Sequence, residues 1–341
     1  MGLERYSRQL RFSRVGLEGQ RKISAGRVAV VGIGALGTVS ANALARAGVG
    51  FLRLIDRDLV DLSNLQRQVL FTEEDAAEGR PKAVAAADFL RRVNSEIHLE
   101  AVAREVSSRN VESLIRDVDV VVDGSDNFEL RYLLNDACVK LGIPWVYGGA
   151  VGAYGATMSI VPGKTACLHC FYGTMPQPGS LDTCSTTGVL AMATGVIANT
   201  QAMETLKLLL DAPVRSGVLM VDLWNNDFTT VAVNRSERCP VCGRGEFPYL
   251  NATGSTRVST LCGEDTVQIS PARGETLPLE RLADNWRGSL GDDEKVLLRD
   301  QVLLLRTAAF TLTVFPDGRA LIRGVRDEAA ARAIYNEYIG M

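Results

Sequence analysis

The sequence predicts an α/β protein built mainly on a Rossmann-like, doubly wound and mostly parallel sheet. Short apolar runs rich in β-branched residues alternate with helical patterns over the first half of the chain. The first of these runs, residues 28–31, passes directly into a glycine-rich turn. Two C-x-x-C cysteine pairs further along predict a zinc-bound C-terminal portion of this fold. Strand and helix patterns near the end of the chain predict a small additional α/β module.

The glycine-rich turn carries the prediction of a nucleotide site. Its glycines are Gly32, Gly34 and Gly37, and a helical pattern of small residues follows at 40–47. In a strand–turn–helix unit the first glycine permits the tight turn, the second lets the backbone approach phosphates, and the third lets the helix pack on the strand. Free N–H groups at the helix start favour an anion. The alternative is a purely structural turn, but the flanking strand and helix favour a nucleotide.

A second strand ends at Asp56, about 20 residues beyond the glycines, where a carboxylate can accept hydrogen bonds from ribose hydroxyls. Asp58 follows closely in the sequence. Next comes a cluster of hydrogen-bond donors that contains Asn64, Arg67 and Gln68. Because such donors suit the oxygens of a triphosphate, the cluster favours ATP over the dinucleotide of a dehydrogenase.

The glycine turn, Asp56 and the donor cluster together resemble the MoeB/ThiF family of ubiquitin-activating-enzyme-like adenylyltransferases. The resemblance covers roughly residues 3–247. It implies a homodimer that uses ATP and Mg²⁺ to activate a ubiquitin-like sulfur-carrier protein. It also implies that Arg8 reaches across the dimer interface to the ATP phosphates of the other subunit. Without the resemblance, the Arg-rich run around Arg8 would indicate a solvated face.

Lys82 and Asp126 are two further candidates for the nucleotide site. Lys82 follows Pro81 at the start of a helical pattern, where the helix dipole disfavours a cation and a phosphate would stabilise one. The alternative is a surface lysine, and the resemblance favours the phosphate role. Asp126 follows a short apolar strand and should face the same crevice as the glycine turn. A carboxylate beside a triphosphate holds Mg²⁺, as the resemblance also implies, whereas the alternative is a helix N-cap.

Gly124 and Ser125 precede Asp126, where relatives often carry Cys and Thr. We do not expect this difference to abolish activity.

Composition excludes several classes of protein. The chain has 341 residues, of which 46% are hydrophobic and 23% are charged, as is ordinary for a globular protein. A net charge of −3 gives no basic footprint for nucleic acid or for an anionic membrane. Residues 1–14 lack the apolar segment of a secretory signal. The apolar stretch at 188–210 contains charged and amide side chains, so it predicts a buried or interface helix and no membrane span. We therefore expect a cytoplasmic protein.

The cysteines point to metal or catalysis. There are seven, an odd number in a chain without an export signal, which argues against a disulfide framework. The two C-x-x-C pairs predict a closed, structural Zn²⁺ site with four thiolate ligands, Cys167, Cys170, Cys239 and Cys242. A redox-active pair is the alternative, but thioredoxin-type motifs come singly.

Cys184 lies between the two cysteine pairs, after a turn-rich run at 172–180 that we expect to be a mobile crossover loop. A helix is predicted to start just after Cys184, and its N-terminus could lower the pKa of the thiol. In the resembled family a cysteine at this position accepts a thioester or acyl-persulfide in some members and is dispensable in others. The residues alone leave open a nucleophile or a small apolar residue at a helix start.

We predict an adenylyltransferase domain at 1–247, with a nucleotide-binding half at 1–150 and a zinc and crossover-loop half at 151–247. A linker at 248–258 then leads to a small α/β domain of unknown function at 259–341. The patterns in that domain predict strands at 266–269, 311–315 and 319–323 and helices at 279–287 and 327–338.

The function that these residues and the resemblance favour is ATP-dependent adenylylation of the C-terminal glycine of a sulfur carrier. The reaction releases pyrophosphate and would belong to molybdopterin, thiamine or related sulfur-transfer biosynthesis. A sulfurtransferase is a further candidate partner. An NAD-dependent oxidoreductase is one alternative, but it leaves Lys82 and the donor cluster unexplained. A non-catalytic nucleotide-binding module is the other, and it would not need the full set of phosphate-facing residues.

Overall fold

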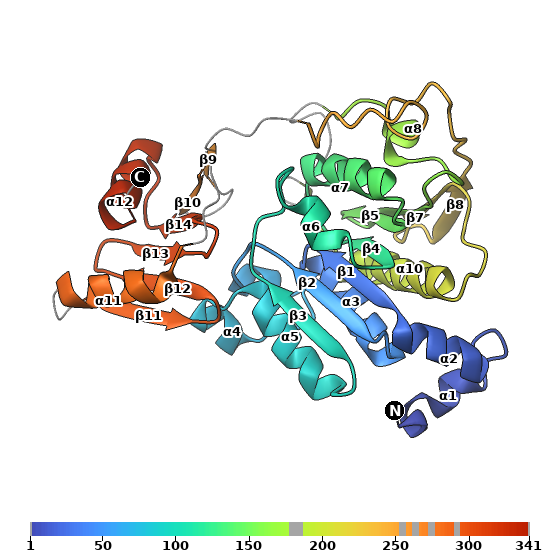
Figure 1. The fold of residues 1–341 in the computed structure, drawn as a ribbon, viewed down its shortest axis with the longest axis horizontal. Coiled ribbons are helices and arrows are strands. Elements are labelled where there is room, and N and C mark those ends of the chain that lie inside the picture. The colour runs from blue at the N-terminus through green and yellow to red at the C-terminus, as the bar shows by residue number, and fades with distance from the viewer. Residues whose placement is uncertain are drawn as a thin grey trace. The chain divides into compact units, whose positions relative to one another are not determined.

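The computed structural model describes residues 2–176, 187–251, 257–260, 266–271, 277–289 and 294–339. The chain divides into two compact units (Figure 1). The larger unit comprises Met1–Val102 and Val106–Ala252, and the C-terminal unit comprises Ala103–Glu105 and Thr253–Met341. No helix among the described residues combines the length and the apolar composition that crossing a bilayer requires.

The larger unit is built on an eight-stranded sheet with the strand order β3-β2-β1-β4-β5-β6-β7-β8. Its strands are β1 Arg27–Val31, β2 Phe51–Ile55, β3 His98–Val102, β4 Val120–Asp123, β5 Trp145–Val151, β6 Tyr154–Ile160, β7 Val218–Asp222 and β8 Asp227–Val231. The strands from β3 to β5 pair in parallel, and those from β5 to β8 pair antiparallel. The predicted doubly wound sheet is confirmed.

Helices cover both faces of this sheet (Figure 1), and side chains alternate between the two faces along β1. Val28 and Val30 pack in one core cluster with apolar residues of α3 and α5. Ala29 and Val31 pack in a second cluster with apolar residues of α7. Among the described residues, the helices of the unit are η1 Leu3–Tyr6, α1 Ser7–Leu10, α2 Gly16–Ala25, α3 Ala35–Ala47, η2 Leu62–Asn64, α4 Glu73–Glu78, α5 Lys82–Val93, α6 Val111–Ile115, α7 Phe128–Leu141, α8 Leu168–Tyr172 and α10 Ala191–Leu209.

Strand β1 is the topological switch point of the sheet. The chain runs from β1 to β2 and β3 on one side and then crosses to β4 on the other side. In a doubly wound sheet, ligands bind beyond the carboxyl ends of the strands at the place where the order reverses. The ends of β1, β2 and β4 therefore frame the candidate site.

The C-terminal unit has its own six-stranded antiparallel sheet, in the order β11-β12-β13-β14-β10-β9. The strands are β9 Arg257–Thr260, β10 Thr266–Ser270, β11 Lys295–Arg299, β12 Val302–Arg306, β13 Thr311–Val314 and β14 Ala320–Arg323. Two helices, α11 Leu279–Ser289 and α12 Glu328–Tyr338, pack on it around Trp286 and Tyr335. The sequence patterns predicted β10, β13, β14 and both helices, but not β9 or the hairpin of β11 and β12.

Candidate active site and metal centre

The glycine turn brings three backbone segments into direct contact. Gly32 ends β1 with φ of +88° and donates its N–H to the Ile55 carbonyl at 2.8 Å. A Cβ atom on Gly37 would lie 1.8 Å from the Gly32 oxygen, and one on Gly124 would lie 2.2 Å from that oxygen. Glycine at both positions therefore lets α3 and the loop after β4 approach the turn this closely in this structure. No side chain caps the start of α3 at Gly34, so that end presents backbone N–H groups.

Asp56, at the end of β2, supports this turn. One carboxylate oxygen accepts the Ile33 N–H at 2.6 Å, and the other accepts the Asp58 N–H at 2.7 Å. Burial raises the pKa of the Asp56 carboxyl, while the Lys82 ammonium acts in the opposite direction. The carboxylate thus shapes the turn that it adjoins, and each of its oxygens keeps a lone pair for a further donor.

Lys82 is the first residue of α5 and is only 7% exposed. Its Nζ lies 3.3 Å from Asp58 Oδ2. Burial by itself lowers the pKa of this ammonium, but the carboxylates of Asp58, Asp56 and Asp126 together raise it above its usual value. A buried ammonium that pairs with Asp58, and whose charged form is stabilised by two further carboxylates, is available to bind a phosphate group. The position is thus not that of an ordinary surface lysine.

Asp126 follows β4 and is exposed. Its neighbour Asn127 caps α7, because the Asn127 side-chain oxygen accepts the Leu130 N–H at 2.8 Å. The N-cap alternative for Asp126 is therefore wrong. The Asp126 carboxylate is therefore not used as a helix cap, and its negative charge helps to raise the pKa of Lys82.

The donor cluster lies in η2 and the turn that follows it. The Asn64 side-chain oxygen accepts from Gln68 Nε2 at 2.9 Å and from Arg67 Nη2 at 3.3 Å, so one amide fixes both neighbours. Gln68 is 4% exposed, and its Nε2 would lie 3.9 Å from a Cβ atom on Gly34. Within the described residues its Oε1 has no hydrogen-bond partner. A buried acceptor beside the glycine turn calls for a donor, which a water or a ligand hydroxyl can supply.

Arg8 is exposed on the short helix α1. Its neighbours hold the segment in place: the buried Tyr6 hydroxyl accepts from Asn94 Nδ2 at 2.9 Å, and Gln9 Nε2 donates to the Ala47 carbonyl at 3.0 Å. No hydrogen bond or ion pair between described residues involves the Arg8 side chain. Within a single chain, no such interaction among the described residues links the Arg8 side chain to the crevice.

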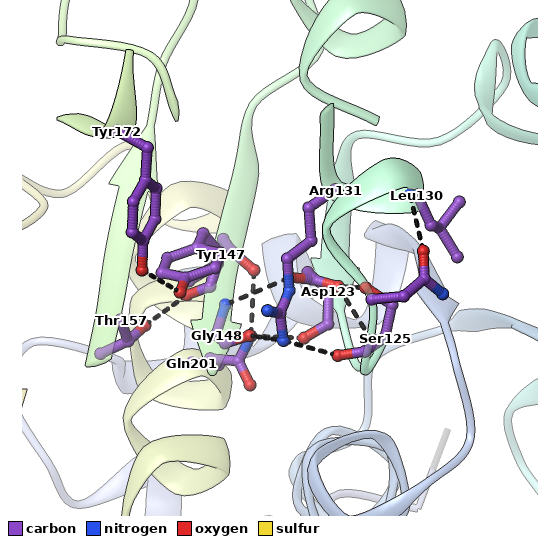
Figure 2. A network of polar contacts seen from close by, with 11 residues as sticks. Asp123, Ser125, Leu130, Arg131, Tyr147, Gly148, Thr157, Tyr172 and Gln201 are labelled. Carbon is purple, nitrogen blue, oxygen red and sulfur yellow. Dashed lines mark hydrogen bonds and ion pairs between the residues drawn. The ribbon is translucent and has the colours of Figure 1, made fainter. Parts of the chain in front are cut away.

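A buried polar network beneath the Asp126 loop was not predicted from the sequence (Figure 2). Asp123, at the end of β4, accepts the Ser125 N–H at 2.9 Å and the Ser125 hydroxyl at 2.6 Å. Its other oxygen lies 3.3 Å from Arg131 Nε. Burial raises the pKa of the Asp123 carboxyl, and the Arg131 guanidinium opposes that shift. Gln201 of α10 donates to the Asp123 carbonyl at 2.7 Å. An acidic residue ending an apolar strand is the only sequence signal of this network.

The four predicted cysteine ligands converge, with every pair of sulfur atoms within 4.8 Å. Cys167 Sγ lies 3.6 Å from Cys239 Sγ, and Cys170 Sγ lies 3.4 Å from Cys242 Sγ. A tetrahedral zinc with Zn–S bonds of about 2.3 Å requires sulfur separations of roughly 3.8 Å, so the cluster fits that ion. Burial raises the pKa of the Cys242 thiol to about 11. A metal would offset this effect by holding the sulfur atoms as thiolates.

The remaining candidate, Cys184, lies outside the described residues, as do residues 177–180 of the predicted crossover loop. Its expected role stays a prediction.

The fold, the glycine turn and the cysteine cluster define the class of the protein: it is a doubly wound α/β protein with a glycine turn at the switch point and a cluster of four cysteines. The chain belongs to the ThiF family, whose model matches residues 6–241.

Named relatives and solved structures agree with this assignment. The sulfur carrier protein ThiS adenylyltransferase of Bacillus subtilis is 41% identical over 338 residues, 98% of this chain and 99% of that protein. The SAMP-activating enzyme E1 of Haloferax volcanii is 42% identical over 71% of this chain and 90% of its own. A crystal structure of Escherichia coli MccB with ATP has a TM-score of 0.62 and 26% identity, over 70% of this chain and 74% of that one.

Proposed function

We propose that this chain is an adenylyltransferase that activates the C-terminal carboxylate of a ubiquitin-like sulfur-carrier protein with ATP. The observation that carries the proposal is the cluster of Lys82, Asp126 and Gln68 around the glycine turn at the switch point of a ThiF-family fold. The family assignment sets aside the NAD-dependent oxidoreductase. A non-catalytic module would have no need for a buried lysine that faces three carboxylates.

In the proposed reaction, a carboxylate oxygen of the carrier attacks the α-phosphorus of ATP. The bond to the bridging oxygen breaks, pyrophosphate leaves, and the carrier remains as an acyl-adenylate. Such chemistry depends on positioning and on charge neutralisation more than on covalent side-chain work. Mg²⁺, held by Asp126, would supply part of that neutralisation.

Cationic, neutral polar and acidic side chains would have different roles in this reaction. Lys82 and Arg67 would bind the polyphosphate, and Arg8 would add a third cation from the partner subunit. Asn64 and Gln68 would orient the nucleotide, and Asp56 would accept from the ribose. The ion pair between Asp58 and Lys82 supports a more specific role for Asp58, which would hold the lysine in place before ATP binds.

The proposal includes one Zn²⁺ per chain with a structural role, since four thiolates leave no open coordination position. It also includes a homodimer in the cytoplasm. Cys184 would receive the acyl group from the adenylate, with its thiolate attacking the carbonyl carbon and AMP leaving. A separate sulfurtransferase would then deliver the sulfur.

We propose a carrier of the ThiS kind. The Bacillus subtilis relative, whose name specifies ThiS, matches nearly the whole chain, the C-terminal unit included. Comparing ThiS-type and MoaD-type carriers as substrates in pyrophosphate release tests this choice. Equal or greater rates with the MoaD-type carrier would contradict it.

Carrier-dependent exchange of labelled pyrophosphate into ATP tests the adenylylation itself. Asp126→Ala and Arg67→Ala should each reduce exchange at least about a hundredfold, because each removes a charge needed at the triphosphate. Asp284→Ala and Arg287→Ala alter an exposed pair on α11 and serve as controls that should retain full exchange. Circular dichroism should show an unchanged fold in all four variants. Exchange at the wild-type rate in Asp126→Ala would refute the proposed site.

A further inference from the structure

Arg131 of α7 joins the loop after β4 to strand β5 (Figure 2). It is 7% exposed. Its Nη2 donates to the Ser125 carbonyl at 2.8 Å and to the Gly148 carbonyl at 3.1 Å, while its Nε lies 3.3 Å from Asp123 Oδ2. One guanidinium therefore holds the loop after β4 against the middle of β5.

This loop leads directly into Asp126. Ser125 is fixed from two sides, because Asp123 accepts its N–H and its hydroxyl while Arg131 binds its carbonyl. The next residue, Asp126, is exposed, so its position depends on the backbone that Ser125 sets. Arg131 thus holds the backbone next to Asp126, while the guanidinium itself stays buried.

Aromatic contacts fix the other side of the guanidinium. Its central carbon lies 5.3 Å from the Tyr147 ring centroid and 5.2 Å from that of Phe128. The Tyr147 hydroxyl lies 2.9 Å from the Tyr172 hydroxyl, and Tyr172 is the last residue of α8. A planar fork that stacks on rings and donates in several directions is specific to arginine, since lysine offers a single point charge.

We propose that Arg131 is a positioning residue of the Mg²⁺–nucleotide site, which places the Asp126 carboxylate where the metal of Mg²⁺–ATP is bound. The proposal rests on the proposed function, because that function assigns Mg²⁺ to Asp126. It adds a residue that acts on the metal through the Ser125 backbone.

Equilibrium binding of ATP, measured by calorimetry with Mg²⁺ and again with EDTA, tests this role. Arg131→Lys should weaken binding of Mg²⁺–ATP about tenfold, as expected for a lost hydrogen bond to a charged group. Binding of metal-free ATP should change by less than about twofold, because the glycine turn and Lys82 are retained. A merely structural role would weaken both forms equally.

Arg53→Lys is the matched control. Arg53 is 8% exposed and pairs with the partly exposed carboxylates of Asp117 and Glu100, so the substitution replaces an arginine that is about as buried as Arg131, but one in the middle of β2. It should lower the melting temperature without changing the ratio of the two ATP affinities. If Arg131→Lys does not fold, the isosteric Asp123→Asn provides the second test, with the same selective loss of Mg²⁺–ATP affinity.

Equal loss of both affinities, wild-type affinity for Mg²⁺–ATP, or the same selective loss in Arg53→Lys would each overturn the role of Arg131. The proposed function fails on a different measurement. It fails if the wild-type protein releases no pyrophosphate with any sulfur carrier, and the ratio of ATP affinities in the Arg131 variant stays interpretable in that case.

Discussion

The pKa values of individual carboxyl groups in this chain depend on the hydrogen-bond donors and cations around them. Asp117 accepts from Arg53 and Arg27, and these guanidinium groups hold the pKa of its carboxyl at about 2. Asp136 lies buried in α7, where it accepts the Tyr249 N–H at 2.8 Å, and no cation pairs with it among the described residues. Burial raises the pKa of Asp136 to about 6. The two residues therefore affect stability with opposite dependence on pH.

The direction in which Asp136 changes the stability with pH follows from proton linkage. Its pKa is higher in the folded state than in the unfolded chain, so the folded state binds more protons between about pH 4 and pH 6. Stability is lost as the pH rises through that window, by up to about 3 kcal/mol for a shift of about two pKa units. Asp136→Asn should therefore raise the melting temperature at pH 7.5, and the gain should shrink steadily as the pH falls from about 6 to 4.5.

Thermal unfolding of both proteins from pH 4.5 to 7.5 measures this difference. Asp117→Asn serves as the contrasting variant, because it removes a group whose pKa is lowered and should destabilise the protein at pH 7.5. A gain for Asp136→Asn that is independent of pH would contradict the burial argument.

The residues that could be predicted from the sequence are those fixed by local spacing. The glycines, Asp56 and Lys82 stand at set distances from a strand or helix start, and the structure brings them together at one edge of the sheet. Arg131 and Asp123 could not be predicted as a pair, because their contact depends on the packing of α7 against β4 and β5. Charged residues in apolar segments are ambiguous until their partners are known.

At the scale of elements, the β11 and β12 hairpin shows where pattern reading fails. Its strands contain a nearly continuous run of Leu and Val, which does not distinguish a buried strand from a buried helix. Its turn is formed by Asp300 and Gln301, both with positive φ, in place of the usual Asn-Gly or Gly. Because the sequence lacks these usual turn residues, the hairpin was not predicted.

The two C-x-x-C pairs are the opposite case. A zinc ion needs four ligands, so the sequence predicts a contact between the pairs that no local helix or strand pattern could predict. Cys167 and Cys239 are 72 residues apart in the sequence and 3.6 Å apart at their sulfur atoms. The first pair lies at the start of α8, with Cys167 at its N-cap and Cys170 inside the helix, and the second pair lies in a stretch without regular structure after β8. A metal that holds both would tie this stretch to the core.

Removal of the metal should therefore lower stability. We expect one zinc per chain in freshly purified protein, and a lower melting temperature after treatment with a strong chelator, since a closed thiolate site contributes folding energy. Cys239→Ser should lose the zinc. Cys138→Ser should keep it, because Cys138 is buried in α7 and does not belong to the cluster. Metal analysis that finds no zinc in the wild-type protein would rule out the site.

At the scale of the whole molecule, each unit has its own sheet and its own apolar core. Within the larger unit, one chain supplies the glycine turn, Lys82 and Asp126, but Arg8 points to solvent on α1. Such an exposed cation in an otherwise anchored segment fits a site shared between two copies of the chain. The family resemblance predicted this sharing, whereas the residues around Arg8 would have indicated only a solvated face.

Mixed dimers test the shared site. Arg8→Ala and Asp126→Ala should each be inactive alone. If Arg8 serves the neighbouring subunit, a mixed dimer holds one site with both lesions and one site with neither. An equal mixture after complete subunit exchange should then recover about a quarter of the wild-type activity, because half of the dimers are mixed and each has one intact site.

If Arg8 instead acts within its own chain, every site in a mixed dimer carries one lesion and no activity returns. Native mass spectrometry of the mixture must show mixed dimers before the assay is interpreted. The double variant Arg8→Ala/Asp126→Ala, exchanged with Asp126→Ala, is the matched control. None of its dimers contains an intact Asp126, so it should stay inactive in either case. Recovery in the first mixture alone would therefore show that one subunit completes the site of the other.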